Sequence, residues 1–284
     1  MHIQSYYHHD TQTFCHLVVD DLSNEAVLID PVADYKANTG KVSHEFSDEI
    51  ITYVNGQGLT LKYVLETHVH ADHLSDAQYI KQHLGGQVFI GGNVALVQQH
   101  FDEVFGLNSQ KEALFDGLVS EGDVISVGEI TIQALATPGH TPACLSYVVR
   151  APNESIHVFV GDTLFMPDIG TARCDFPGGD AKALYQSIQS IYALGDDAQL
   201  HMCHDYPPED REVRSVVSVQ EQKVHNVHCA GSTTESEFIE KRQARDANLD
   251  APRLILPSLQ VNVRAGHLPE QDKLGRRFLK IPLR

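Results

Sequence analysis

Short apolar runs separated by polar, glycine-containing connections recur along most of the chain, and their lengths are typical of β-strands. The runs are rich in Val, Ile and Leu, which favour strands. A less regular stretch at 94–118 is expected to hold a helix and a loop. The predicted strands are Phe14–Val19, Ala26–Ile29, Leu61–Leu65, Val88–Ile90, Val124–Val127, Ile130–Ala136, Cys144–Val149, Ile156–Val160 and Gln199–Cys203.

Helices are predicted where apolar residues recur every three or four positions. Leu184, Ile188 and Ile191 show this spacing, and Asp180 precedes them as a suitable N-cap. From Ala251 onwards the chain is Pro-rich, so we expect an extended C-terminal segment. The predicted helices are Phe46–Asn55 with Ser43 or Ser47 as cap, Asp76–His83, Ala181–Leu194, Arg214–Val227 and Glu235–Ala247.

The order of these elements indicates the fold class. Strands joined by short connections are followed by a helix, and this order occurs twice. Such an order fits an α/β protein in which two mixed β-sheets pack face to face with helices outside. The chain of 284 residues has no internal repeat, and Pro152-Asn153 marks a turn and not a linker. We therefore expect one domain over 1–284, with a C-terminal extension from about residue 251.

Charge and composition exclude several classes of function. The net charge is −17, from 38 acidic residues against 21 Lys plus Arg. A surface this acidic argues against nucleic acid and against anionic membranes as partners. No apolar run approaches the roughly 20 residues that a membrane span needs. The start of the chain, Met1–Ser5, lacks a basic and apolar signal pattern, so a cytoplasmic location is expected.

The five cysteines do not form a pattern of paired residues. Their number is odd and no two are separated by two residues, which argues against a disulfide framework and against a thiolate zinc site. We expect them to be reduced and buried. Cys174 is the candidate exception, because it lies beside Arg173, whose guanidinium would favour a thiolate.

The densest chemical signal is the segment Thr67–His73, directly after the predicted strand Leu61–Leu65. It contains four potential metal ligands within six residues: His68, His70, Asp72 and His73. Alternate side chains of an extended segment point the same way, so the first two histidines can converge, and the other two residues can face a second point nearby. Imidazole and carboxylate ligands suit zinc, iron or manganese. The segment predicts an open, catalytic metal centre.

Three further candidate ligands lie just after predicted strands. His140 follows Ile130–Ala136, Asp162 follows a strand and a glycine, and His204 follows the last core strand. Loops at the end of a sheet are where such sites form, and a glycine before a ligand allows close backbone approach. Each of these residues alone is a weak signal, and their value lies in this order after the dense segment.

The order and spacing of these candidate ligands resemble the metal-binding pattern of the metallo-β-lactamase superfamily. Its pattern is His-x-His-x-Asp-His followed by a distant His, Asp and His on an αββα sandwich, and the resemblance covers nearly the whole chain. The pattern is specific for the superfamily and not for the reaction. The matching residues are His68, His70, Asp72, His73, His140, Asp162 and His204.

Longer segments narrow the resemblance. Gly139–Cys144, His204–Tyr206 and Asn262–Gly266 are similar to persulfide dioxygenases of the ethylmalonic-encephalopathy protein group, and Gly170–Gly179 is similar to its bacterial branch, often encoded with sulfide-detoxification functions. The resemblance implies one Fe(II) per chain and oxidation of glutathione persulfide, or a similar small persulfide, by O₂ to sulfite and thiol. The implied iron ligands are His68, His140 and Asp162. The residues that would remain from a second metal site, supporting the iron without binding it, are His70, Asp72, His73 and His204.

The thiol carrier should meet cationic side chains, because glutathione has two carboxylates. The candidates are Arg173, Arg264, Lys223 and Tyr206. The chain also departs from the related group. It has Leu74-Ser75-Asp76 where that group has Ile-Thr-Gly, the stretches 34–46 and 98–118 look like insertions, and His228 replaces an arginine of the human-type branch.

Two alternatives remain open. A dizinc thioester hydrolase resembling glyoxalase II (hydroxyacylglutathione hydrolase) would use the same ligands, with a bridging hydroxide aimed at a carbonyl. A non-catalytic metal-binding or sulfur-carrier protein is the second alternative, although structural metal sites usually have no open coordination position. The oligomeric state and a rhodanese partner are likewise left open by the sequence.

Overall fold

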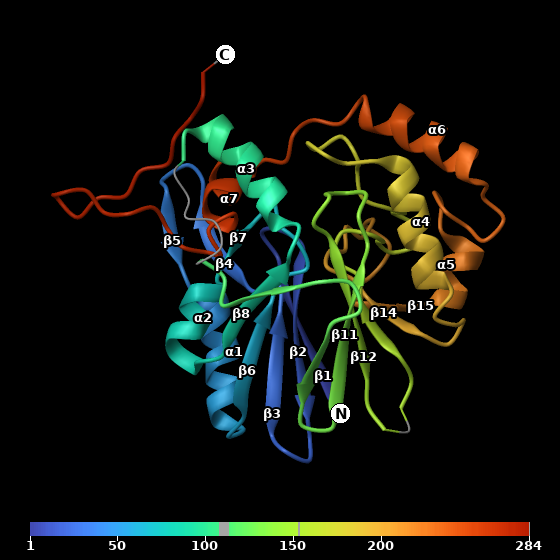
Figure 1. Cartoon of the computed structure of the whole chain (residues 1–284), viewed down its shortest axis with the longest axis horizontal. Helices are drawn as coiled ribbons and strands as arrows, with labels where there is room; N and C mark the ends of the chain where they lie inside the picture. The colour runs from blue at the N-terminus through green and yellow to red at the C-terminus, as the bar shows by residue number, and fades with distance from the viewer. Residues whose placement is uncertain (108–113, 153, 284) are drawn as a thin grey trace.

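Two six-stranded β-sheets pack face to face, and helices cover both outer surfaces (Figure 1). This computed structural model describes residues 1–107, 114–152 and 154–283. The predicted αββα architecture with two mixed sheets is confirmed. Of the candidate insertion at 98–118, residues 108–113 lie outside the described part.

The first sheet has the order β1-β2-β3-β6-β8-β9. Its first three strands pair antiparallel, and the pairs from β3 to β9 are parallel. A small separate sheet, with the order β5-β4-β7, lies in the same half of the chain. The strands are β1 (His2–His8), β2 (Thr13–Asp20), β3 (Glu25–Ile29), β4 (Val32–Lys36), β5 (Lys41–Ser43), β6 (Thr60–Leu65), β7 (Leu74–Ser75), β8 (Gln87–Gly91) and β9 (Gly117–Val119).

The second sheet has the order β10-β11-β12-β13-β14-β15. Its pairs are antiparallel except for β13 with β14, which run parallel. The strands β11, β13 and β14 therefore end at the same edge of the sheet. The strands are β10 (Val124–Val127), β11 (Ile130–Ala136), β12 (Leu145–Arg150), β13 (His157–Phe159), β14 (Gln199–His201) and β15 (Val216–Ser218).

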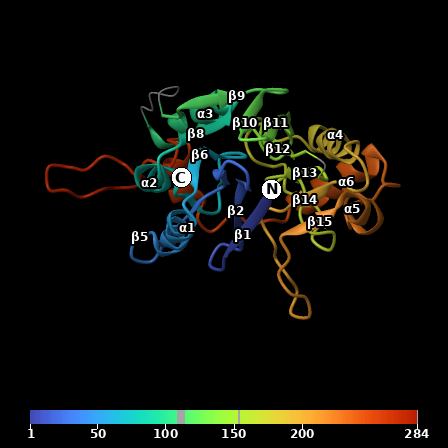
Figure 2. The same ribbon diagram turned by 90° about the horizontal axis from the view of Figure 1, so that it is seen from below.

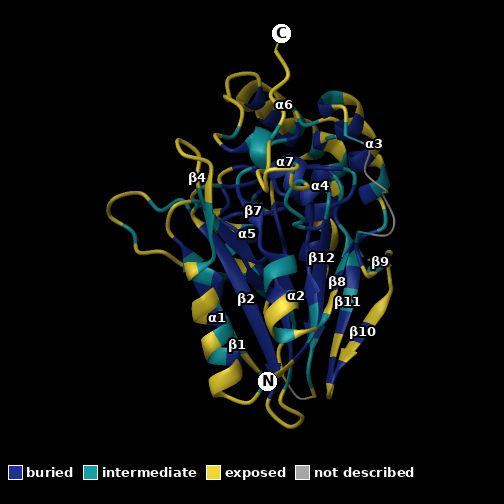
Figure 3. Cartoon of the chain, turned by 90° about the vertical axis from the view of Figure 1, so that its left-hand side faces the viewer, coloured by how far each residue is buried: buried dark blue, intermediate teal, exposed yellow. Residues whose placement is uncertain are grey.

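Most of the helices lie on the outer faces of the two sheets, whereas α3 and α7 lie above the upper ends of the strands in Figure 1. Seen from below, α1 and α2 lie on the side of the first sheet, and α4, α5 and α6 on the side of the second (Figure 2). Figure 3 shows that α1 turns an exposed face outward while β2 is buried along its length. The helices are α1 (Glu45–Gly56), α2 (Ala77–Leu84), α3 (Val94–Phe105), α4 (Ala181–Tyr192), α5 (Val219–His225), α6 (Glu235–Asp246) and α7 (Ile255–Asn262). Among the described residues, no helix is both long and apolar enough to cross a bilayer.

The strand β2 shows why the core strands are apolar on both faces. Leu17 and Val19 belong to the cluster under the helices of the first sheet, whereas Val18 belongs to the cluster between the two sheets. Since alternate residues of a strand point to opposite faces, a strand covered on both sides needs apolar residues on both faces, as Leu17–Val19 provide here. Tyr147 and Phe159 of the second sheet are the large side chains of the inner cluster.

Several predicted elements are corrected by the structure. The segment Arg214–Val227 is not one helix, because β15 occupies its first part and α5 begins at Val219. The segment after Ala251 is not wholly extended, since it contains α7. Pro257 is compatible with this helix because it stands in the first turn, where backbone N–H groups have no intrahelical partner. The helix buries Leu259 and Val261 against the body of the protein.

Candidate metal centre

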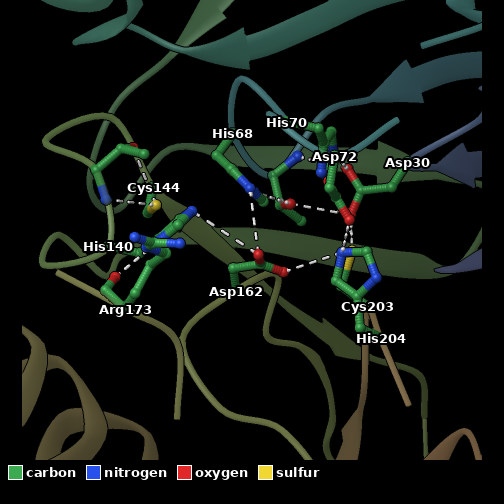
Figure 4. A network of polar contacts seen from close by, with 12 residues as sticks. Asp30, His68, His70, Asp72, His140, Cys144, Asp162, Arg173, Cys203 and His204 are labelled. Carbon is green, nitrogen blue, oxygen red and sulfur yellow. Dashed lines mark hydrogen bonds and ion pairs between the residues drawn. The ribbon is translucent and has the colours of Figure 1, made fainter. Parts of the chain in front are cut away.

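The seven candidate ligands come together at the ends of the strands that precede them. The segment 67–73 follows β6, and the loops that carry His140, Asp162 and His204 follow β11, β13 and β14. The strand directions place these loops at one edge of the sandwich. Figure 4 shows labelled ligand side chains from all of these segments, including His68, Asp162 and His204, pointing toward one another. The structure thus brings together all the residues that the sequence proposed as ligands.

His68, His140 and Asp162 form the first group of potential ligands. Both Nε2 atoms lie 3.8 Å from Asp162 Oδ2. His140 Nδ1 donates to the carbonyl of Arg173 at 2.8 Å, which leaves the Nε2 lone pair facing the centre. The Thr67 hydroxyl donates to Asp30, so it accepts from His68 Nδ1 at 3.0 Å, and the Nε2 of this histidine is also free.

His70, Asp72, His73 and His204 form a second group beside the first. His204 Nε2 lies 3.2 Å from Asp72 Oδ2 and 3.4 Å from Asp162 Oδ1. Its Nδ1 lies 3.2 Å from the carbonyl of Gln12, which fixes the orientation of the ring. Asp162 therefore presents one carboxylate oxygen to each group, so the two groups share it.

The donor atoms fit a bound cation. Buried polar atoms normally have hydrogen-bond partners, and an unsatisfied one costs about 1–3 kcal/mol. Burial lowers the pKa of His68 well below its usual value and lowers that of His73 to about 4, so both rings are neutral and have lone pairs to donate. Within the described residues, the buried atoms of these groups that lack a hydrogen-bond partner are His68 Nε2, His70 Nδ1, His73 Nε2, His204 Nε2 and Asp162 Oδ1.

Asp30 and Glu66 are buried carboxylates that contact His70 of the metal-binding segment. The sequence alone did not identify them as site residues. Asp30 Oδ1 lies 3.0 Å from His70 Nε2 and accepts from the Thr67 N–H at 2.8 Å. Burial by itself would lower the pKa of His70, but the carboxylates of Asp30 and Glu66 raise it well above its usual value, so Nδ1 would have to release its proton to bind a cation. Asp30 has a φ of 54°, a left-handed conformation that is uncommon outside glycine. The Asp-Pro pair after β3 was the available sequence signal.

Asn262, the last residue of α7, holds the backbone of the same segment. Its amide nitrogen donates to the carbonyls of His70 at 2.8 Å and His73 at 2.7 Å, and its oxygen accepts from the Ser75 N–H at 2.8 Å. The side chain is buried. The C-terminal helix thereby holds the metal-binding segment in place through three hydrogen bonds to its backbone.

A cavity of about 460 Å³ opens on the centre. Asp72, His140 and Asp162 line it on the side of the ligands, and Phe165 and Tyr206 are among its other lining residues. A cavity of this size matches the usual range for small-molecule sites. The ligands therefore face a space in which a substrate can reach them.

The four predicted substrate-binding residues differ in position. Tyr206 lines the cavity, and its ring stacks on His204 at 5.6 Å between centroids. Arg173 lines it too, but its guanidinium contacts both carboxylate oxygens of Asp175 at 2.5 and 2.6 Å. Lys223 pairs with Asp196 at 2.6 Å, and neither it nor Arg264 lines this cavity.

Cys174 is buried, and burial raises the pKa of its thiol to about 12, so the thiolate that its neighbour Arg173 suggested is not formed at neutral pH. The other four cysteines are also buried and free. We expect none of the five thiols to react with a chromogenic disulfide reagent in the native protein at pH 8, and all five to react after unfolding in guanidinium. Rapid labelling of Cys174 in the folded protein, located by peptide mass mapping, would contradict this expectation.

The comparison with protein families decides the assignment. A model described as the metallo-beta-lactamase superfamily matches residues 10–204, a range that includes all seven candidate ligands. The chain belongs to the metallo-beta-lactamase superfamily. Its fold is thus that of a metal-binding superfamily, with a His and Asp cluster at the expected edge.

Relatives within the superfamily have different names. A probable metallo-hydrolase of Burkholderia pseudomallei is 45% identical and is matched over 100% of this chain and 99% of its own length. Glyoxylase B2 of Dictyostelium discoideum is 41% identical, over 94% and 91% of the two chains. The human mitochondrial persulfide dioxygenase ETHE1 is 30% identical, over 89% and 84%.

Among solved structures, ETHE1 from Myxococcus xanthus has a TM-score of 0.74 and 30% identity, and the match covers 94% of this chain and 100% of that one. This superfamily member thus resembles persulfide dioxygenases along most of its length. It is also similar to proteins with hydrolase names.

Proposed function

We propose that this superfamily member is an iron-dependent persulfide dioxygenase that acts on glutathione persulfide or a similar small persulfide. The observation that carries the proposal is the group His68, His140 and Asp162, in which two imidazoles face one carboxylate oxygen beside an open cavity. Two histidines and one carboxylate form the ligand set of non-haem Fe(II) oxygenases, which leaves further positions open. The likeness to two proteins named ETHE1 supports the same reading.

The proposed reaction converts R–S–SH, O₂ and H₂O into R–SH, HSO₃⁻ and H⁺. The sulfur–sulfur bond breaks, and the terminal sulfur loses four electrons, which reduce O₂. The thiol carrier leaves without a change of oxidation state. Iron bound by the three ligands would supply the redox chemistry that activates O₂ and a position for the terminal sulfur.

The chain itself orients and shields the reacting groups. The carbonyl of Arg173 holds His140 in one tautomer, and Thr67 does the same for His68. Phe165 and Phe176 line the cavity and exclude water beside the ligands. In this proposal His70, Asp72, His73 and His204 maintain the site without binding the iron.

A second candidate, a dinuclear thioester hydrolase, rests on the completeness of the second ligand group. The unpartnered Nε2 atoms of His73 and His204 lie beside Asp72, and two relatives bear the names of a metallo-hydrolase and a glyoxylase. Such an enzyme would bind two zinc ions and lower the pKa of a bridging water.

Metal analysis together with thioester hydrolysis distinguishes the two candidates. Protein purified without O₂ should contain one iron per chain, and its cleavage of S-lactoylglutathione should stay near the uncatalysed rate whether iron or zinc is loaded. Two zinc ions per chain with rapid cleavage of S-lactoylglutathione would overturn the dioxygenase proposal in favour of the hydrolase.

A further inference from the structure

One wall of the cavity is formed by α6 and the segment 247–254 that follows it, which in Figure 1 crosses above the two sheets toward α7. Four arginines line the cavity: Arg173, Arg242, Arg245 and Arg253. This concentration contrasts with the chain as a whole, where 38 acidic residues outnumber 21 Lys plus Arg. The four arginines divide into two pairs with different surroundings.

The first pair, Arg173 and Arg242, stabilises the wall. Arg242 is buried, contacts Asp246 at 2.7 Å and donates to the carbonyl of Thr171 at 3.0 Å. Arg173 pairs with Asp175 and donates to the carbonyl of Asp250 at 2.6 Å. These contacts fasten α6 and the segment after it to the loop that carries Arg173, so both guanidinium groups are already engaged by the protein.

The second pair, Arg245 and Arg253, has no such partners. Both residues are exposed and line the cavity. Within residues 1–107, 114–152 and 154–283, neither side chain forms an ion pair or a hydrogen bond to the protein. Because α6 is fastened through Arg242, Arg245 is presented to the cavity from a fixed helix, one turn from its anchoring residue.

We propose that Arg245 and Arg253 form a carboxylate-binding subsite for the thiol carrier, which deepens and rests on the function proposed above. A guanidinium binds a carboxylate through two parallel hydrogen bonds, a geometry that lysine cannot offer. A chain with a net charge of −17 repels an anionic carrier in general, so local cations are needed to bring it into the cavity.

The residues that line the cavity suggest the orientation in which the thiol carrier would bind. Phe165, Ile169 and Phe176 form an apolar part of the cavity together with the metal ligands, which suits the sulfur end of the carrier. Leu249 and Pro252, which are close in the sequence to the two free arginines, line the cavity as well. A small thiol peptide with free carboxylates, such as glutathione, would place its sulfur at the ligands and a carboxylate at the arginines.

The test measures binding of glutathione, the thiol product, to the metal-loaded protein by titration calorimetry. Arg245→Gln and Arg253→Gln should each raise the Kd for glutathione about tenfold, in line with the roughly 1.5 kcal/mol of a hydrogen bond to a charged group. Glutathione dimethyl ester, which lacks both carboxylates, should bind the unsubstituted protein more weakly, and the two substitutions should not change its Kd.

The matched control is Lys182→Gln, which also removes one positive charge. Lys182 pairs with Glu235 and does not line the cavity. The control should leave the Kd for glutathione unchanged. The subsite is overturned if glutathione does not bind at millimolar concentration, if the control weakens binding as much, or if the diester is affected equally. Loss of glutathione binding in both arginine variants, with no O₂ uptake on persulfide by the unsubstituted protein, would support the subsite and reject the dioxygenase.

Discussion

Replacing Asp162 by alanine should empty the metal centre and abolish turnover while the protein stays folded. Asp162 presents one oxygen to His68 and His140 and the other to His204, so its removal disrupts both ligand groups at once. The loss of turnover should be larger than about 100-fold, which is the most that removal of a residue that only positions a metal ligand typically costs. Metal content by mass spectrometry and turnover of the same sample measure the effect.

Asp168→Ala is the matched control for this variant. Asp168 follows in the same loop region and pairs with Arg211 at 2.8 Å, and it does not line the cavity. It should keep full metal content and activity. An Asp162→Ala protein that binds metal at the level of the unsubstituted protein would show that this carboxylate is not a ligand.

Replacing Asn262 by alanine should lower the stability of the folded protein more than any other substitution proposed for this chain. The substitution leaves two buried carbonyls, those of His70 and His73, and the Ser75 N–H without partners. At about 1–3 kcal/mol for each unsatisfied buried group, the free energy of unfolding should fall by roughly 3 kcal/mol or more. Metal affinity should fall too, because the backbone that positions the ligands loses its support.

Urea unfolding followed by circular dichroism measures the loss. The control is Asn248→Ala, which replaces an exposed asparagine whose amide donates, within the described part of the chain, to the carbonyl of Ala244 alone. It should change stability by less than about 0.5 kcal/mol. Equal destabilisation by the two substitutions would mean that α7 does not hold the metal-binding segment.

The ligands of the segment 67–73 were predictable because their signal is local, and the more distant ligands were predictable from their order after it. His68, His70, Asp72 and His73 lie within six residues, and His140 and Asp162 follow strands whose apolar character is plain in the sequence. Strand ends converge at one edge of a sheet by geometry alone, so their three-dimensional clustering followed from a correct strand assignment.

The supporting and substrate-facing residues depend on contacts between distant segments. Asp30 and Asn262 lie 40 and 192 residues from His70. The Asp-Pro pair marks Asp30 as the end of a strand, but the local sequence of neither residue indicates a hydrogen bond to such a distant segment. Arg173 was selected for its charge, which Asp175 two residues later largely neutralises. Arg245 and Arg253 look like ordinary surface cations until the fold places them on the cavity.

Simultaneous measurement of O₂ uptake and sulfite release tests the central claim most directly. Iron-loaded protein given glutathione persulfide in air-saturated buffer should consume one O₂ for each sulfite and each glutathione that it releases, and the Asp162→Ala variant should do neither. Consumption of persulfide without O₂ uptake, or O₂ uptake without sulfite, by the iron-loaded protein would contradict the assignment of a persulfide dioxygenase.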